Sequence, residues 1–167
     1  MQIRLATPND AGAVARVHVR AWQVAYRGLL PDAYLDGLRP EERAARYTFN
    51  GQDPNRPTTI VAAREGVILG FATVGRARDK TRAGGELMAL NVDPPFWNQG
   101  VGRALIAAAR EHLVQSSHRE AELWVLDGNE RAYRFYAADG WSPDGGKRTE
   151  TVWGVRLTDL RYTRRLP

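Results

Sequence analysis

The chain has 167 residues, of which 43% are hydrophobic and 26% charged, and this balance fits one compact globular domain over residues 1–167. It contains no cysteine, which excludes disulfides, thiolate nucleophiles and cysteine-based metal sites. The N-terminus lacks an apolar signal segment, and no apolar run could cross a bilayer, so we expect a cytoplasmic protein with no membrane partner. The net charge of +5 suits an anionic ligand, either nucleic acid or a phosphorylated cofactor, with a solvated basic face as the alternative.

The first third of the chain predicts a short strand followed by helices. Gln2 to Ala6 forms the strand, and Thr7-Pro8-Asn9-Asp10 is typical of a helix start. Apolar residues then recur at helical spacing, with a second face that carries His18, Trp22 and Tyr26. A second helical stretch runs from Pro40 to Tyr47, and Gly51 to Pro57 reads as a polar loop.

The period then changes to that of β-strands. Thr58 to Ala63 and Val67 to Val74 are apolar and β-branched, and Glu65-Gly66 between them predicts a tight hairpin. Glu86 to Val92 predicts a third strand of this set, which Asp93-Pro94-Pro95 ends.

The second half alternates between helices and strands. We expect a helix from Gly100 to Gln115, a strand from Ala121 to Leu126, and a helix from Asn129 to Ala138. Two more strands follow, the clearer of them from Val152 to Thr163. This order predicts a mixed α/β sheet whose faces are covered by helices.

The glycine-rich turn Asn98 to Arg103 lies between a predicted strand and a predicted helix. Glycines there allow a sharp turn and a close ligand approach, and the free N–H groups of a helix start favour a pyrophosphate. A plain pair of loop glycines is the alternative. A P-loop is excluded because no G-x-x-x-x-G-K-[ST] stretch occurs, and a dinucleotide fingerprint is excluded because Leu105 occupies the third glycine position.

Two longer stretches resemble a known family. Glu86 to Pro94, followed by Phe96 to Leu105, is similar to the acyl-CoA motif of the GNAT superfamily, a strand with a V-D-P-like turn and then [Q/R]-x-x-G-x-[G/A]. Trp97 departs from that pattern at its first position. Leu123 to Trp141 resembles the strand and helix that follow in the family. The resemblance implies a mostly antiparallel sheet flanked by helices, with a splayed central strand pair that holds acyl-CoA.

The same resemblance implies an N-acetyltransferase that moves an acetyl group from acetyl-CoA to a primary amine. Tyr136 is then the general acid that protonates the CoA thiolate, with an ordinary half-buried tyrosine as the alternative. Tyr133 is the second choice for this acid, or a wall of the CoA channel. Glu86 is the candidate base, since Glu86, Met88 and Leu90 share one strand face by period two. An idle glutamate and a water chain are its alternatives.

The expected cofactor contacts follow the two motifs. We assign the Leu90 amide to the thioester carbonyl and the Val92 amide to pantetheine. Asn129 is either a helix cap or a pantetheine contact, and Arg103 is either a phosphate contact or an exposed arginine. We expect no metal, because His18, His112 and His118 lack ligand spacing. The complete set is Leu90, Asn91, Val92, Asn98, Gln99, Gly100, Val101, Gly102, Arg103, Ala104, Asn129, Ala132, Tyr133 and Tyr136.

The acceptor site is the least defined by the sequence. The resemblance places it at the first helix and its following loop, and at the loop between the last strands. The residues concerned are Trp22, Tyr26, Leu29 and Tyr34, together with Ser142 to Glu150. Simple aromatic packing is the alternative for Trp22 and Tyr26, and nothing selects a small molecule over a peptide or protein.

Two rival functions and one assembly question remain open. A non-catalytic acyl-CoA-binding regulatory domain would keep the glycine turn and lose the acid. A nucleic-acid-binding module would need clustered basic residues with stacking aromatics, which the sequence lacks, so we expect no nucleic-acid partner. Family members are often homodimers, and the sequence leaves that state open.

Overall fold

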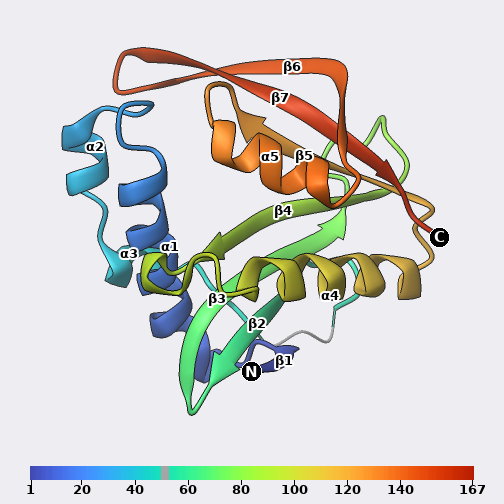
Figure 1. Cartoon of the computed structure of the whole chain (residues 1–167), viewed down its shortest axis with the longest axis horizontal. Helices are drawn as coiled ribbons and strands as arrows, with labels where there is room; N and C mark the ends of the chain where they lie inside the picture. The colour runs from blue at the N-terminus through green and yellow to red at the C-terminus, as the bar shows by residue number, and fades with distance from the viewer. Residues whose placement is uncertain (50–52) are drawn as a thin grey trace.

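The computed structural model describes residues 1–49 and 53–167, which form a seven-stranded sheet flanked by helices (Figure 1). The strand order is β1-β2-β3-β4-β5-β7-β6. Every neighbouring pair is antiparallel except β4 and β5, which are parallel. The predicted mixed, mostly antiparallel α/β fold is therefore confirmed.

The elements follow the expected order along the chain. The strands are β1 (Gln2–Leu5), β2 (Thr58–Arg64), β3 (Val67–Arg76), β4 (Gly85–Val92), β5 (Glu120–Leu126), β6 (Ser142–Val152) and β7 (Val155–Arg165). The α-helices are α1 (Ala11–Ala25), α2 (Asp32–Asp36), α3 (Pro40–Ala44), α4 (Val101–Gln115) and α5 (Glu130–Ala138), and Pro8–Asp10 and Pro94–Phe96 are short 3-10 turns. No helix of the described ranges is long and apolar enough to span a membrane.

Two hydrophobic clusters bind the helices to the sheet. The larger one lies under α4 and α5, where Leu105 and Leu113 of α4 pack on Leu69 and Leu123 of the sheet. The other contains Val14 and Val17 of α1 with Phe71 of β3 and other apolar residues of β2 and β3. Since each helix buries one apolar stripe, α4 and α5 cover one face of the sheet and α1 covers the opposite face.

The two hairpins differ in how well the sequence predicts them. Glu65 and Gly66 both have positive φ values, of 51° and 80°, as the expected tight turn requires. The last hairpin is placed differently from our expectation, because its turn is Trp153-Gly154. The predicted strand from Val152 to Thr163 therefore crosses a turn, and Ser142 to Glu150, which we expected to be a loop, forms most of strand β6.

Other boundaries shift only slightly. The helical stretch predicted from Pro40 to Tyr47 ends at Ala44. The polar loop predicted from Gly51 to Pro57 begins outside the described residues, which omit 50–52.

Strand β4 contains a β-bulge that changes which face its side chains occupy. Val74 of β3 pairs with Leu87, and the adjacent Thr73 pairs with Ala89, so Met88 is the extra residue. Leu87 and Leu90 consequently both lie in the cluster under α4, whereas Ala89 packs on the α1 side. The expectation that Glu86, Met88 and Leu90 share one face is wrong, because the bulge interrupts the period of two.

Candidate active site

The site is an opening in the middle of the sheet. Strands β4 and β5 pair only at Gly85 with Ala121 and at Glu86 with Glu122, and beyond that point they diverge (Figure 1). A cleft of about 1050 Å³ occupies the space between them. Its walls come from α1, β4, the glycine turn, α4, β5 and α5. Eleven of the predicted site residues line it: Tyr26, Leu90, Asn91, Val92, Asn98, Gly100, Gly102, Arg103, Asn129, Ala132 and Tyr136.

The glycine turn has the geometry that its sequence predicts. Gly100 precedes α4 with φ +82°, a left-handed conformation that favours glycine, and no atom lies within 4 Å of the position of its missing Cβ. Gly102 meets a different constraint, since a Cβ there would lie 3.2 Å from the ring of Phe135 on α5. The first glycine therefore permits the turn, and the second permits the close packing of α4 and α5.

The exposed edge of β4 presents backbone groups to the cleft. The Asp93 N–H donates to the carbonyl oxygen of Leu69 on β3, at 2.8 Å. Since backbone N–H groups alternate along a strand, the amides of Leu90 and Val92 point the other way, toward β5. The buried carboxylate of Asp93 accepts from Arg20 Nε at 3.0 Å, which attaches this turn to α1.

Trp97 makes two contacts that the sequence did not predict. Its Nε1–H donates to the carbonyl oxygen of Val92, at 2.7 Å. The guanidinium of Arg131, on the first turn of α5, lies over the indole ring at 3.4 Å from its centroid. Both residues line the cleft. A contact between elements so distant in the chain leaves no local pattern, and only the departure of Trp97 from the motif drew attention to this position.

The cleft is electropositive. Arg103, Arg131 and Arg134 line it, and none of them pairs with a carboxylate of the described residues. The one acidic residue of the lining, Asp139, already pairs with Arg110 and Arg164. Uncompensated positive charge next to a helix N-terminus is the arrangement that binds phosphates.

Two tyrosines lie on the lining of the cleft. Tyr136 is half-buried, its ring packs against Phe135 and Trp141, and its hydroxyl has no hydrogen-bond partner among the described residues. Burial, followed by the nearby Tyr26, raises the pKa of Tyr136 well above its ordinary value. Burial also raises the pKa of Tyr26 to about 12, with a contribution from Asp159 and Glu150. Both phenols are therefore protonated at neutral pH.

Tyr133 has a different environment from Tyr136. Its hydroxyl donates to Asp127 at 2.8 Å and accepts from the Gly128 N–H at 2.7 Å. Its ring stacks on Tyr162 at a centroid distance of 6.0 Å, and it is not among the residues that line the cleft. The geometry thus argues against Tyr133 as a second acid or as a wall of the channel.

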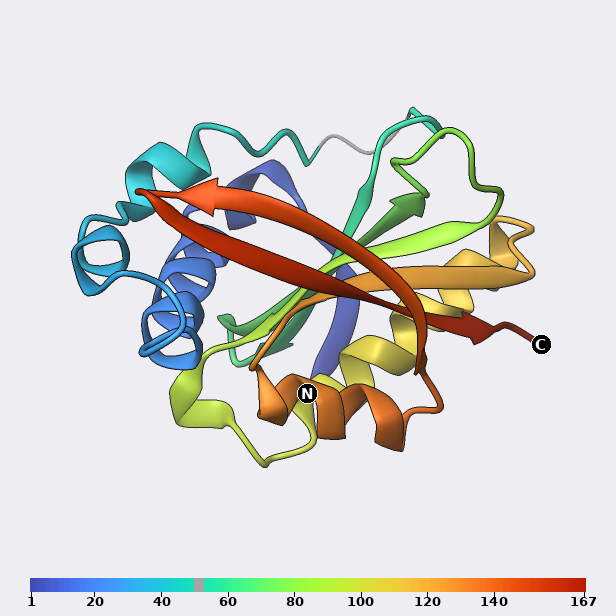
Figure 2. The same ribbon diagram turned by 90° about the horizontal axis from the view of Figure 1, so that it is seen from above.

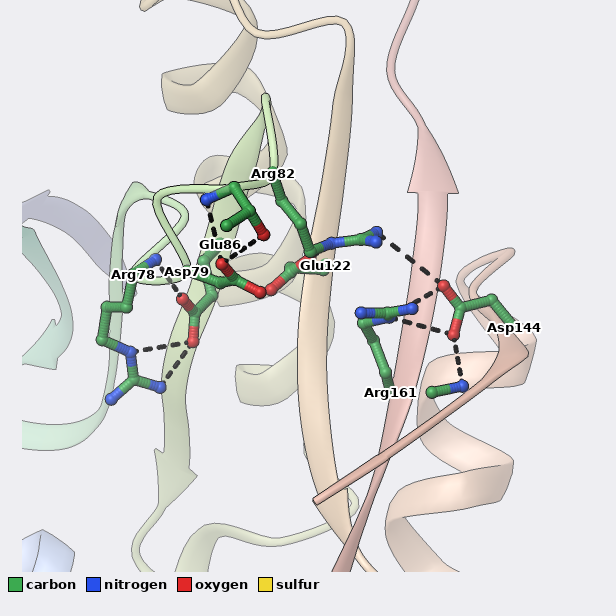
Figure 3. Close-up of polar contacts among 9 residues, drawn as sticks. Arg78, Asp79, Arg82, Glu86, Glu122, Asp144 and Arg161 are labelled. Atoms are coloured by element: carbon green, nitrogen blue, oxygen red, sulfur yellow. Dashed lines mark hydrogen bonds and ion pairs between the residues drawn. The ribbon is translucent and has the colours of Figure 1, made fainter.

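Glu86 lies at the closed end of the opening and not on its lining. Its side chain is buried, and its two carboxylate oxygens accept from the Arg78 N–H at 2.9 Å and from Arg78 Nε at 3.0 Å (Figure 3). This ion pair raises the pKa of Arg78. A carboxylate held in this way has no free oxygen directed into the cleft, which argues against direct proton transfer to Glu86.

The expected cofactor contacts divide into two groups. Asn129 lines the cleft and also caps α5, accepting from the Ala132 N–H at 3.2 Å, so the cap is present. Gln99, Val101 and Ala104 do not line the cleft, and the side chain of Val101 is buried in the core. Their role in cofactor binding stays a prediction that depends on their backbone.

The predicted acceptor residues form an aromatic group beside the cleft. Trp22 lies between His18 and Tyr26, at centroid distances of 4.7 and 4.9 Å. The tip of the β6–β7 hairpin reaches the side of the sheet where the helices after α1 lie (Figure 2). There Tyr34 of α2 meets Trp153 of the hairpin turn, edge to face at a centroid distance of 5.7 Å. Of the predicted acceptor residues Trp22, Tyr26, Leu29 and Tyr34, only Tyr26 reaches the lining of the cleft.

Trp124 of β5 is a lining residue that the sequence analysis did not select. The guanidinium of Arg148 lies over its ring at 4.5 Å, and that of Arg161 at 5.6 Å. Both arginines also pair with carboxylates, Arg148 with Asp159 and Arg161 with Asp144. Unlike the three arginines of the cleft, these two therefore carry compensated charge.

Comparisons with known proteins agree on one family. The model of the acetyltransferase (GNAT) family matches residues 20–141. The uncharacterized N-acetyltransferase YuaI of Bacillus subtilis (strain 168) is 29% identical over 95% of this chain and 89% of its own length. An aminoglycoside N(6')-acetyltransferase type 1 of Stenotrophomonas maltophilia is 29% identical over 93% of this chain and 92% of its own. The crystal structure of the PaiA N-acetyltransferase of Thermoplasma acidophilum, in complex with coenzyme A, has a TM-score of 0.78 at 18% identity, with 99% of each chain covered.

The family model covers most of the chain, and it spans both the glycine turn and the strand and helix that close the cleft. This match agrees with the resemblance found in the sequence and with the opening between β4 and β5. The chain belongs to the acetyltransferase (GNAT) family, and it is an acetyl-CoA-dependent acyltransferase.

Proposed function

We propose that the protein transfers the acetyl group of acetyl-CoA directly to a primary amine of a small-molecule or peptide acceptor. The observation that carries this proposal is the opening between β4 and β5, which combines a phosphate-binding turn with a protonated tyrosine in one cleft. A direct transfer requires both substrates in one site, and this cleft reaches from α4 and α5 on one face of the sheet to α1 on the other.

The donor side uses mainly backbone groups. The glycine turn and the start of α4 would hold the pyrophosphate, and the free edge of β4 would pair with pantetheine as an added strand does. We assign the Leu90 amide to the thioester carbonyl oxygen, where negative charge develops during the reaction, and the Val92 amide to pantetheine. Their direction toward β5 supports this assignment.

Tyr136 would supply the proton that the departing thiolate needs. Its hydroxyl lies on the cleft without a hydrogen-bond partner in residues 1–49 and 53–167, and burial keeps it protonated at neutral pH. A neutral phenol in this position can donate to a thiolate as it leaves. Tyr26, which approaches from α1, lies on the opposite side of the opening.

The proposed base is water, because both carboxylate oxygens of Glu86 are already engaged. Arg78 occupies both oxygens of Glu86, so direct abstraction would require that ion pair to open. We therefore propose that the amine loses its proton to water in the cleft. Glu86 remains the candidate that receives this proton at the end of a chain of water molecules.

The acceptor would enter from the α1 side, next to Tyr26 and the aromatic group of α1 and α2. The aminoglycoside acetyltransferase, similar over nearly its whole length, is named for an amine acceptor, which supports an amine here. Glu150, which contributes to the raised pKa of Tyr26 and pairs with no arginine of the described residues, provides negative potential that would attract a cationic amine.

The test is a screen of acetyl-CoA turnover. Release of free CoA would be followed with amino acids, polyamines, aminoglycosides and short peptides, and acetylated products would be identified by mass spectrometry. We expect turnover with at least one amine class and a mass increase of one acetyl group. Tight binding of acetyl-CoA without acetylation of any amine would contradict the proposal and favour a non-catalytic acyl-CoA-binding domain.

A further inference from the structure

The contact between Trp97 and Arg131 joins the two walls of the cleft. Trp97 lies just before the glycine turn on the β4 side, and Arg131 lies on the first turn of α5. A hydrogen bond holds the indole in place, because its Nε1–H donates to the Val92 carbonyl oxygen at 2.7 Å. The guanidinium lies over the ring at 3.4 Å. Arg131 is exposed, but an arginine stacked on an anchored ring has a defined position, whereas an exposed arginine without such a contact usually samples many.

Arg131 carries a charge that the protein does not neutralise. Among the residues of the described ranges, no carboxylate pairs with it and no acceptor receives its hydrogen bonds. Partial burial in the cleft lowers the pKa of Arg131, since the charged form loses some of its hydration. A solvent-exposed cation on the lining of the cleft, paired with no carboxylate of the described residues, is suited to an anionic ligand.

The stacked geometry also suits a phosphate in particular. Stacking uses the face of the guanidinium and leaves its N–H groups free at the edge, where they can donate to two oxygens at once. Trp97 is separated from Gly100 by only two residues, and Arg131, Gly100 and Gly102 line the same cleft. Side-chain and backbone donors are therefore available to one anion in this cleft.

Given acetyl-CoA as the donor in the proposed function, we infer that Arg131 binds the pyrophosphate of CoA and that Trp97 is the residue that positions it. Trp97 acts on the ligand only through Arg131. Its own Nε1–H is not available, because it already donates to the Val92 carbonyl oxygen. Arg103 and Arg134 line the same cleft without such a support, so they contribute charge but no fixed geometry.

Calorimetry with three ligands tests this assignment. CoA carries the pyrophosphate and a ribose 3'-phosphate, dephospho-CoA lacks the 3'-phosphate, and pantetheine lacks both. We expect Arg131→Gln to weaken CoA and dephospho-CoA equally, by about tenfold, the lower end for a charge-assisted hydrogen bond. Pantetheine affinity should not change. Arg16→Gln, at an exposed position of α1 outside the cleft, is the control for lost positive charge.

Variants of Trp97 test the positioning role. Trp97→Phe keeps a ring under the guanidinium and should retain most of the CoA affinity, whereas Trp97→Leu should lose about as much as Arg131→Gln. In the Arg131→Gln background, Trp97→Leu should cost little more, because the two residues act as one unit.

If the wild-type protein binds CoA, acetyl-CoA stays the donor, and three results would then overturn the inference about Arg131 and Trp97. They are unchanged CoA affinity in Arg131→Gln, a loss for CoA but not for dephospho-CoA, and additive losses in the double variant. Absence of CoA binding to the wild-type protein would instead contradict the proposed function itself.

Discussion

Replacing Tyr136 by phenylalanine removes one hydroxyl from the cleft and leaves the packing of the ring unchanged. The ring contacts Phe135 and Trp141 at centroid distances of 5.2 and 6.5 Å, and the hydroxyl makes no hydrogen bond to any described residue. Folding stability should therefore change by less than about 0.5 kcal/mol. If the hydroxyl protonates the thiolate, kcat and kcat/KM should both fall by about 10²–10⁴-fold, since the loss occurs in the transition state.

Tyr133→Phe is the matched control, because the same atom is removed one helical turn away. There the hydroxyl bridges Asp127 and the Gly128 N–H, at 2.8 and 2.7 Å, so its loss leaves both groups without their partner. Both bonds are solvent-exposed, so water replaces them in part, and we expect a cost of about 0.5–1 kcal/mol in the free energy of unfolding, or roughly 1–4 °C in Tm. Turnover should stay within about threefold of wild type, well below the range for a lost acid.

The two variants thus predict opposite patterns, and steady-state kinetics with thermal unfolding on the same samples would separate them. Acetyl-CoA affinity, measured by calorimetry, should stay near wild type in both. Near-normal kcat in Tyr136→Phe, or a loss that appears only as weaker acetyl-CoA binding, would refute the acid role. A larger kinetic loss in Tyr133→Phe would transfer the role to that residue.

Three further variants test the glycine turn, the base and a buried histidine. Gly100→Val should weaken CoA binding at least about tenfold, because φ +82° is unfavourable for a β-branched residue; unchanged affinity in a folded variant would exclude the pyrophosphate from this turn. Glu86→Gln should lower turnover mainly at low pH and spare CoA binding, and Arg78→Gln is its control, since an equal loss there would point to the ion pair alone. Burial, together with Arg43 and Arg46, lowers the pKa of His18 to about 3 in the folded protein. As pH drops from about 6.5 toward 3, the unfolded chain therefore binds a proton on His18 that the folded protein does not, and the free energy of unfolding of the wild type falls. His18→Phe should remove about 2–3 kcal/mol of the difference in unfolding free energy between pH 7 and pH 4.5 in urea titrations, and an unchanged pH dependence would contradict a neutral buried His18.

Local patterns in the sequence were sufficient for most elements of this fold. The glycine turn, the Asn129 cap and the Glu65-Gly66 hairpin each depend on residues that are close in the chain, and the structure has all three. The Trp153-Gly154 turn escaped prediction because tryptophan rarely adopts the left-handed conformation it has there, with φ 48°. With tryptophan in place of the asparagine or aspartate that usually precedes glycine in such a turn, one long strand was the natural interpretation.

The candidate site was harder to predict because its geometry depends on contacts between distant elements. The bulge at Met88 reverses the face of Glu86 relative to Leu90, and no residue type in β4 marks a bulge. Trp97 stands where the motif that it resembles has glutamine or arginine, and Arg131, which lies over its ring, comes from α5. A pattern along the chain cannot show that a side chain of one element lies over the ring of another.

Two neighbouring acids lie at the point where the sheet opens. Glu86 and Glu122 are paired across β4 and β5 at the last contact between these strands, and both are buried. Like charges directly opposite each other destabilise strand pairing, and a buried carboxylate needs a partner. Arg78 and Arg82 supply these partners from one loop between β3 and β4 (Figure 3).

This loop connects the two halves of the sheet at the closed end of the cleft. Arg82 also approaches Asp144 of β6 at 3.8 Å, so it contacts the β5–β7–β6 half while Arg78 holds β4 (Figure 3). The bulge at Met88 follows immediately and interrupts the regular pairing of β4. Because ion pairs hold the closed end while the open end has no strand pairing, motion of the cleft should be concentrated near Val92 and α5. That is the end where Trp97 and Arg131 meet, so their stack is the contact that a bound pyrophosphate can strengthen.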